Sequence, residues 1–435
     1  MNLPESILYC IQALENAGFA AYAVGGCVRD ACLGITPHDY DLCTSAKPEE
    51  MESVFAGHRL VLSGKKHGTV GVVTESGVVE ITTFRTEGAY LDNRHPSWVA
   101  FVPNIEEDLA RRDFTVNAMA YSPIRGFADP FGGQKDLKNQ TLRAVGIPAQ
   151  RFQEDALRIL RGVRFAVRFR LTVDPETGNA METLAPLLDH LSRERVFEEL
   201  CKLLLLVTPE DLSRFAPILA HAIPELKPMI GFDQRTPYHR FDLFTHTALV
   251  TGGVPAQLPL RWAALLHDVG KITSFTVDES GQGHFYGHAK ESARMADDIL
   301  LRLKAPNDLR KQAVSLIEHH MTPLLPDKKL LRRRLSQYGT EALSLQLLLQ
   351  EADCAATGVA QKEVHFDEIR RILADIQAED ACLSLKSLAV NGHDLMGLGY
   401  TGPEIGKVLN QLLDAVLDEQ LPNDKAALLE AAKQR

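Results

Sequence analysis

Hydrophobic and polar positions divide the chain into an N-terminal part with mixed periodicity and a longer part with helical periodicity alone. Apolar residues recur at helical spacing over residues 4–17, which predicts a helix that ends at Gly18. Short apolar and β-branched runs predict strands at residues 20–24, 40–44, 69–74 and 78–84. The last two runs are separated by Ser76 and Gly77, which is typical of a hairpin. We therefore expect a small mixed β-sheet with flanking helices.

From Arg151 onward the strand patterns nearly vanish, and apolar residues recur every three or four positions up to the C-terminus. Glycine and proline residues near position 230 mark a junction. The chain is too long for one ordinary core. We expect an α+β protein with an all-α C-terminal part, and the predicted domains are 1–145, 146–230, 231–358 and 359–435.

The composition is typical of a globular protein, with 45% hydrophobic and 24% charged residues among 435. No apolar run approaches the roughly 20 residues that span a bilayer. The N-terminal segment carries acids and no basic cluster, so it is interpreted as a helix and not as a signal peptide. The seven cysteines are scattered without a C-x-x-C pair, which argues against a disulfide framework and favours a reducing cytoplasm.

The net charge of −10 at first disfavours a nucleic-acid partner, but only the local field over a binding face decides this. Two dense basic stretches stand out. One contains five arginines over residues 158–170, and the other spans residues 328–334. The second stretch is equally well explained as a solvated helix face.

The first candidate site begins where a predicted strand runs into Gly25 and Gly26. Glycines allow the backbone to approach a phosphate, the following helix offers free N–H donors, and Arg29 adds a cation. Asp39 and Asp41 follow, and positions two apart on a strand project on the same side. Two adjacent carboxylates are typical ligands of hard divalent cations such as Mg²⁺, which bridge to substrate phosphates.

Together these segments resemble the class II tRNA nucleotidyltransferases and their relatives, the bacterial poly(A) polymerases. The segments that match the motifs of this family, in order, are Gly25–Asp30 with Asp39–Asp41, Arg111–Ala120, Asp129–Leu137, Glu154–Arg158 and Ser192–Glu199. Five motifs in order over about 170 residues are too many for chance agreement. The resemblance implies a nucleotidyltransferase head over 1–145 and a nucleotide-selecting, RNA-binding neck over 146–230.

The resemblance also implies the chemistry. The 3′-hydroxyl of tRNA attacks the α-phosphate of CTP or ATP, Asp39 and Asp41 hold Mg²⁺, and pyrophosphate leaves. The residues implied to bind the nucleotide are Gly26, Arg29, Arg112, Asp113, Asn117, Asp155, Arg158, Arg161 and Arg164.

The Glu154–Arg158 segment also has a physical interpretation. Asp155 and Arg158 are three apart, so on one helix they share a face, and Arg161 and Arg164 continue it. An aspartate beside an arginine can match the edge of a base, and a good bidentate contact discriminates by roughly 1–3 kcal/mol. Arg161 and Arg164 would then face the triphosphate or the primer end. The alternative is an intrahelical ion pair on a surface.

The polar segment 85–103 is predicted to be a loop, and it resembles the flexible loop of family members that add all three nucleotides. This favours addition or repair of the 3′-terminal CCA. A poly(A) polymerase or a C-adding enzyme of the same family remains the alternative. Glu80 could supply a third acidic group, but a plain strand carboxylate is the simpler interpretation.

A second candidate site comes from clustered histidines. His246, His267, Asp268 and Asp353 resemble the four core positions of the HD phosphohydrolase superfamily. Such ligands suit Ni, Mn, Fe or Zn, which activate water against phosphate esters. Three further residues that could support a second ion are His288, His319 and His320. The alternative is a degenerate domain that keeps these residues and serves as an RNA-binding body.

The last segment, 359–435, is predicted to be a helical tail that docks RNA, and His393 within it is interpreted as structural. Expected partners are the tRNA 3′ end, CTP and ATP, without a membrane. From another class of function, the rival is an HD phosphohydrolase whose head only binds RNA. A non-enzymatic RNA scaffold is disfavoured by the intact carboxylates.

Overall fold

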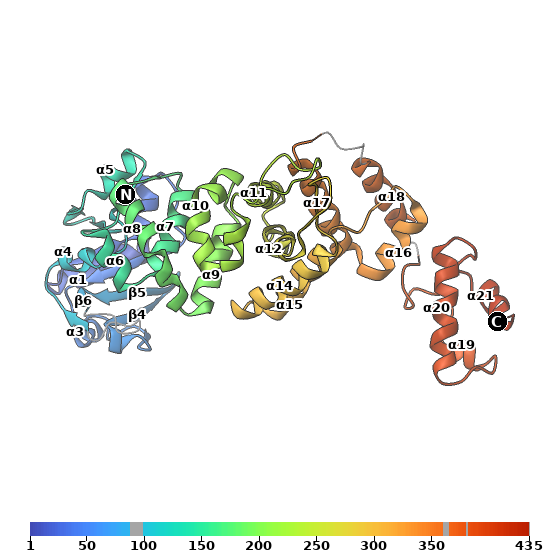
Figure 1. Cartoon of the computed structure of the whole chain (residues 1–435). Coiled ribbons are helices and arrows are strands. Elements are labelled where there is room, and N and C mark those ends of the chain that lie inside the picture. The colour runs from blue at the N-terminus through green and yellow to red at the C-terminus, as the bar shows by residue number, and fades with distance from the viewer. Residues whose placement is uncertain (88–98, 360–364, 380–381, 435) are drawn as a thin grey trace. The chain divides into compact units, whose positions relative to one another are not determined.

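The computed structural model describes residues 1–87, 99–359, 365–379 and 382–434 (Figure 1). Contacts divide the chain into two compact units. The first unit contains residues 1–207 and 214–227, and the second contains residues 208–213 and 228–435. The four shorter domains predicted from the sequence stay a prediction.

The first unit is built on a seven-stranded mixed sheet of order β3-β4-β5-β2-β1-β8-β9. Its strands are β1 Ala21–Val24, β2 Asp41–Thr44, β3 Leu60–Val61, β4 Thr69–Thr74, β5 Gly77–Thr83, β8 Ala120–Ser122 and β9 Gly126–Ala128. β1 pairs antiparallel with β2 and β8, while β2 and β5 run parallel. The hairpin predicted around Gly77 is the β4–β5 pair.

Helices cover this sheet and continue beyond it. They are α1 Glu5–Asn16, α2 Gly26–Cys32, α3 Pro48–Val54, α4 Ile105–Ala110, α5 Gly133–Lys138, α6 Pro148–Glu154, α7 Leu157–Arg168, α8 Pro175–Leu184, α9 Arg193–Leu204 and α10 Pro209–Ala222. The boundary between the units runs within α10. Val24 and Cys43 of the sheet share a buried cluster with Leu109 of α4, which fixes the helix beside the end of β1.

The segment predicted as a loop begins and ends as paired strands. β6 Arg85–Glu87 and β7 Val99–Phe101 form an antiparallel pair, and residues 88–98 lie outside the described residues. The prediction missed these strands because polar residues hide a pairing that depends on the partner strand. Short strands also follow Arg151, since β11 Thr172–Val173 pairs parallel with β10 Thr141–Leu142.

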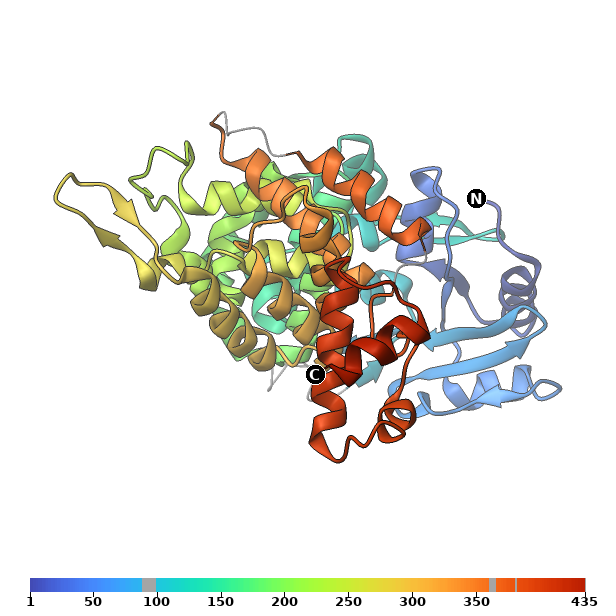
Figure 2. The same cartoon turned by 90° about the vertical axis from the view of Figure 1, so that its right-hand side faces the viewer.

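The second unit is helical apart from one short hairpin. Its helices are α11 Leu243–Gly253, α12 Leu258–Leu266, α13 Lys271–Ser274, α14 His288–Arg302, α15 Asn307–His319, α16 Lys328–Tyr338, α17 Thr340–Ala356, α18 Phe366–Ala378, α19 Gly392–Met396, α20 Pro403–Leu417 and α21 Lys425–Lys433. The hairpin of β12 Thr276–Val277 and β13 Gly283–His284 extends away from the helices of this unit (Figure 2). A sheet head followed by helices is the α+β class predicted from the sequence.

The basic stretch at the start of α16 makes ion pairs within the second unit. Lys328 and Arg332 contact Glu379 after α18, at 2.8 and 3.0 Å, and Arg333 contacts Asp418 after α20 at 2.6 Å. These lysine and arginine residues therefore have carboxylate partners within the second unit.

Among the residues that the structure describes, no helix combines the length and the apolar character needed to cross a membrane.

Candidate active site and a histidine cluster

The first site is built around the turn that follows β1. Gly25 has a φ of 77°, a conformation that favours glycine, and its N–H donates to the Met119 carbonyl at 3.0 Å. A Cβ atom on Gly25 would lie 2.7 Å from Nη1 of Arg112, so a side chain there would displace this arginine. Gly26 then begins α2, and the turn brings the helix start beside Arg112.

Register places the acidic pair next to this turn. Asp41 is the first residue of β2 and lies directly opposite Val24, the last residue of β1. Asp39 lies two residues before the strand, so the argument that strand geometry projects both side chains on the same side does not apply to it. Neither carboxylate has a hydrogen bond or ion pair with any described residue. Desolvation raises the pKa of Asp41, Arg112 opposes this shift, and the charge of Asp39 adds to it.

Arg29 is buried within the first unit and is held on several sides. Its Nη1 donates to Oδ1 of Asn117 at 2.6 Å, and its Nε donates to Oδ1 of Asp30 at 2.8 Å. The guanidinium also lies 4.3 Å from the centre of the Phe169 ring, a cation–π contact. The cation expected beside the glycine turn is thus fixed in place before any ligand binds.

Asp113 connects this arginine, through Asn117, to Arg161 of α7. Its Oδ1 accepts hydrogen bonds from Nδ2 of Asn117 at 3.0 Å and from the Phe114 N–H at 2.8 Å. Its Oδ2 accepts a hydrogen bond from Nε of Arg161 at 2.9 Å and forms an ion pair with Nη2 of the same arginine at 2.7 Å. Burial alone would raise the pKa of Asp113, but Arg161 and the hydrogen bonds outweigh it, so the pKa is lowered.

Asp108 holds the two arginines that precede Asp113. This carboxylate is buried in α4 and contacts Nη2 of Arg111 at 2.9 Å and Nη2 of Arg112 at 3.4 Å. Sequence reasoning missed Asp108, although its position four residues before Arg112 on a helix is a signal for such a contact.

The segment around Asp155 departs from the expected continuous helix. α6 ends at Glu154, α7 begins at Leu157, and Asp155 between them has an extended backbone. Asp155 and Arg158 therefore do not share a helical face, and the predicted geometry was wrong. The Asp155 side chain itself accepts a hydrogen bond from the Leu157 N–H at 3.1 Å, which competes with helix continuation.

Asp155 and Arg158 also have separate partners. Oδ2 of Asp155 accepts from Nη2 of Arg195 at 2.8 Å. Nη1 of Arg158 donates to Oε2 of Glu154 at 2.7 Å, and its Nη2 donates to the Arg111 carbonyl at 2.9 Å. The alternative interpretation, an ion pair between Asp155 and Arg158 on one helix, is thus not the observed pairing. Sequence reasoning missed the contact with Arg195, because 40 residues separate the partners.

The two arginines predicted to continue the stripe are engaged with protein carboxylates. Arg161 contacts Asp113, and Nε of the buried Arg164 donates to Oε2 of Glu199 in α9 at 2.6 Å. Both arginines therefore tie α7 to neighbouring segments, and their guanidinium groups already have acceptors.

The second site lies in the second unit, where histidines from four helix ends converge on Asp268. Oδ2 of Asp268 lies 3.1 Å from Nε2 of His267 and 3.5 Å from Nε2 of His246. Asp353 completes this group, with Oδ1 3.0 Å from Nε2 of His246. On the other side, Oδ1 of Asp268 lies 3.4 Å from Nε2 of His288 and 3.7 Å from Nε2 of His320.

Two triads therefore have ligand atoms close enough for one ion each, with Asp268 common to both. They are His246, His267 and Asp268, and Asp268, His288 and His320. His319 is not among them, since its ring packs at right angles against Tyr338 with 4.9 Å between the ring centres.

Backbone contacts orient all four rings. The Nδ1 atoms of His246, His267, His288 and His320 donate to the carbonyls of Ala356, Ala264, Phe285 and Ile317 at 3.2, 2.8, 2.8 and 2.7 Å. Each Nε2 then faces the cluster, and Nε2 of His288 lies 3.3 Å from Nε2 of His320 as well as near Asp268. A backbone contact at Nδ1 with Nε2 turned inward is typical of metal-binding histidines. Burial lowers the pKa of His320 to about 4, which favours the neutral ring that a metal needs.

Polar atoms in this cluster lack hydrogen-bond partners. Nε2 of His246, Nε2 of His267 and both carboxylate oxygens of Asp268 are buried without one. Burying polar atoms without hydrogen bonds is costly, and a bound cation would satisfy the Nε2 atoms together with Asp268, so the donor set fits such an ion. Lys271, which sequence reasoning missed, places its Nζ 2.8 Å from Oδ2 of Asp268 and supplies a nearby positive charge.

Comparisons with known proteins decide the family. Residues 21–143 match the poly A polymerase head domain, residues 170–229 match a probable RNA- and SrmB-binding site of polymerase A, and residues 284–432 match a putative domain 2 of tRNA nucleotidyltransferases. A CCA-adding enzyme of Streptococcus mutans is 34% identical over 99% of this chain and 97% of its own length. The chain belongs to the CCA-adding enzymes, the class II tRNA nucleotidyltransferases.

Other relatives agree with this family. The CCA-adding enzyme of Streptococcus suis is 35% identical over 99% of this chain and 98% of its own length. The crystal structure of the Bacillus stearothermophilus CCA-adding enzyme in complex with CTP covers 100% of this chain and 98% of its own, with 30% identity and a TM-score of 0.73. The Thermotoga maritima CCA-adding enzyme complexed with tRNA shares the fold, with 21% identity over 98% of this chain and 94% of its own and a TM-score of 0.58. The resemblance expected from the five motifs is confirmed.

Proposed function

We propose that this protein builds or repairs the 3′-terminal CCA of tRNA from CTP and ATP without a nucleic-acid template. The observation that carries the proposal is the position of Asp39 and Asp41, two carboxylates without partners beside the Gly25 turn, in a chain of the CCA-adding family. In the reaction, the 3′-hydroxyl oxygen of tRNA bonds to the α-phosphorus of the nucleotide. The bond from that phosphorus to the bridging oxygen breaks, and pyrophosphate leaves.

Asp39 and Asp41 fit a Mg²⁺ site by their donor chemistry. Both offer carboxylate oxygens without partners, and their mutual repulsion contributes to the raised pKa of Asp41, so a cation between them would be stabilised. When bound, such ions activate the attacking hydroxyl and neutralise charge on the leaving pyrophosphate.

The surrounding residues bind and orient the nucleotide in this proposal. Gly26 leaves the start of α2 open to a phosphate, and Arg29 and Arg112 supply fixed positive charge beside it. Asn117 holds Arg29 directly, and Asp113 holds Asn117, so both residues keep the nucleotide-binding arginine in place. Because Arg161 and Arg164 already have acceptors, we assign them to holding α7 and not to direct phosphate contact.

Base selection is proposed for Asp155 and Arg158. Asp155 is hydrogen-bonded to Arg195, and Arg158 to Glu154. When a base binds, these hydrogen bonds would have to break or be shared with the base. Neutralising one partner should therefore change which nucleotide is chosen as well as how fast it is added.

The test is incorporation of labelled CTP and ATP into a tRNA that lacks CCA, with Mg²⁺ present. Asp41→Ala should abolish incorporation and leave the unfolding temperature unchanged, because the carboxylate is repelled by Asp39 and has no hydrogen-bond partner among the described residues. Glu75→Ala, which removes an exposed acid from the β4–β5 turn, is the matched control and should be fully active. Normal incorporation by Asp41→Ala would overturn the assignment. Sequencing the added 3′ ends separates CCA addition from poly(A) or C-only addition.

A second function is supported by the buried partnerless atoms of the histidine cluster. We propose that residues 231–358 form an HD-type domain in which His246, His267, Asp268 and Asp353 bind one divalent metal, with His288 and His320 as ligands of a second. When bound, such metals supply an activated water for hydrolysis of phosphomonoesters or cyclic phosphates at RNA ends.

This second proposal has its own test. Phosphate release from an RNA that ends in a 2′,3′-cyclic phosphate is measured with Ni²⁺, Mn²⁺, Fe²⁺ or Zn²⁺ added singly. His267→Ala should lose release and keep CCA addition, whereas Asp41→Ala should do the opposite. Release that persists in His267→Ala would remove the cluster from the reaction, and the RNA-binding body would then be the better interpretation.

A further inference from the structure

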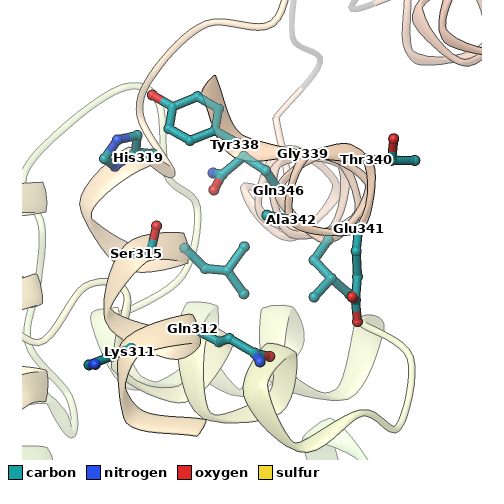
Figure 3. A pocket seen from close by; sticks show the side chains of 12 residues that line it. Lys311, Gln312, Ser315, His319, Tyr338, Gly339, Thr340, Glu341, Ala342 and Gln346 are labelled. Atoms are coloured by element: carbon teal, nitrogen blue, oxygen red, sulfur yellow. The ribbon is translucent and has the colours of Figure 1, made fainter. Parts of the chain in front are cut away.

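A cavity of about 490 Å³ lies in the second unit between α15 and the start of α17 (Figure 3). The residues that line it belong neither to the Asp39 and Asp41 site nor to the two histidine triads. Leu316 and Leu345 supply a buried apolar surface, and Tyr338 and His319 line one side. A volume of this size suits a small organic ligand.

Two polar groups that border the cavity are buried without a hydrogen-bond partner among the residues that the structure describes. Gln346 is 7% exposed, and its Nε2 has no hydrogen-bond partner. Figure 3 shows its amide pointing from α17 toward α15, between Tyr338 and Ser315. Nδ1 of His319 is likewise buried without a partner. An unpaired buried amide N–H costs free energy, so a ligand with an acceptor atom at this point would remove that cost.

Positive charge lies at the rim of the same cavity. Lys311 is exposed and has no ion-pair partner among the described residues, and Ser315 lies one helical turn further along α15. The first turn of α17 also lines the cavity, and its N-cap residue, Gly339, offers no side-chain cap to the free N–H groups. Figure 3 places the exposed acid Glu341 across the cavity from Lys311, so an anion at Lys311 does not meet this carboxylate directly.

We propose that this cavity binds a nucleoside monophosphate, either as a free nucleotide or as one unstacked nucleotide of an RNA chain. The planar base would lie on Leu316, Leu345 and the aromatic side, where the amide of Gln346 donates to an acceptor on its edge. The phosphate would lie at the rim with Lys311, on the side of the cavity away from Glu341. The inference does not depend on the chemistry proposed for the Asp39 and Asp41 site or for the histidine cluster.

Hydrogen exchange of the full-length protein tests this site apart from the nucleotide site of the first unit. AMP, adenosine, inorganic phosphate and a pentameric oligoadenylate are each titrated, and protection is followed in peptides covering residues 311–319 and 338–346. AMP should protect both peptides, and adenosine or phosphate alone should do so much more weakly. Protection by the oligonucleotide only would assign the site to a nucleotide of RNA, which still supports the shared chemistry.

Two variants test the contacts separately. Lys311→Ala and Gln346→Met should each lower the affinity for the protecting ligand at least about tenfold, which is the effect of losing one hydrogen bond to a charged or buried partner. Gln346→Met keeps the volume and removes only the unpaired amide, so the unfolding temperature should hold. Lys329→Ala, an exposed lysine of α16 outside the cavity, is the matched control. Absence of protection by all four ligands, or equal affinity in Lys311→Ala and Lys329→Ala, would overturn the proposal.

Discussion

Nε of Arg161 donates a hydrogen bond to Oδ2 of Asp113 at 2.9 Å, and Nη2 forms an ion pair with the same oxygen at 2.7 Å, across 48 residues of chain. Asp113 in turn accepts from Asn117, and Asn117 accepts from Arg29. This relay connects α7 to the glycine turn, so a residue predicted to touch the substrate holds in place the residues that we propose to bind it.

Loss of the Asp113 charge should destabilise the first unit in a pH-dependent way. Asp113→Asn should lower the free energy of unfolding at pH 7 by roughly 2–3 kcal/mol, because it weakens buried hydrogen bonds to a charged group. Since the folded state lowers the pKa of Asp113, its contribution is present above the ordinary aspartate pKa of about 3.9 and is lost as pH falls below it. Urea unfolding at several pH values measures the difference, with the exposed Asp189→Asn as control. A difference that stays constant between pH 7 and pH 3 would contradict the assigned cause.

Nucleotide choice should depend on Asp155 and, through it, on Arg195. Asp155→Ala should reduce the preference between CTP and ATP about tenfold while total incorporation falls less, because one base-edge contact is lost. Arg195→Ala should shift the preference in the same direction, and Arg195→Lys should restore part of it, because a cation returns beside Asp155. The measurement is the ratio of added C to added A on tRNAs that end before or after the CC. An unchanged ratio in Asp155→Ala would refute base selection by this residue.

The Gly25 turn should tolerate no side chain. Gly25→Ala should cost roughly 1–2 kcal/mol of stability because of its positive φ, and should also lower incorporation at least about tenfold because the new Cβ displaces Arg112. Gly18 offers a matched control, since its φ is +89° and nothing lies within 4 Å of its would-be Cβ. Gly18→Ala should lose similar stability and keep incorporation, so equal losses of activity in the two variants would count against the role of Arg112.

A metal that binds the histidine cluster should stabilise the second unit. Metal at about 100 times its dissociation constant should add roughly 2.7 kcal/mol to the free energy of unfolding, and a chelator should remove this gain. Calorimetry with each metal measures the shift. His267→Ala should abolish it, whereas His393→Ala in α19 should keep it, because His393 lies outside the cluster. An equal shift in both variants would place the metal elsewhere.

Local sequence patterns predicted much of the fold. The strands at 69–74 and 78–84, the first helix and the glycine turn could be predicted, since periodicity and turn residues act within a few positions. The break at Asp155 could not, because one side-chain hydrogen bond to the Leu157 N–H competes with a helical pattern that is otherwise continuous. The β6–β7 pair could not be predicted for a similar reason, because each of its strands is stabilised by pairing with the other.

The sequence by itself determined the family, because the motif residues occur in a fixed order that a linear pattern preserves. Only the tertiary structure decided which side chains contact each other. Arg161 contacts Asp113, Asp155 contacts Arg195, and His320, not His319, joins the histidine cluster. Such contacts depend on which helix faces meet and on which buried charges need neutralising, and these are properties of the packed chain and not of any short segment.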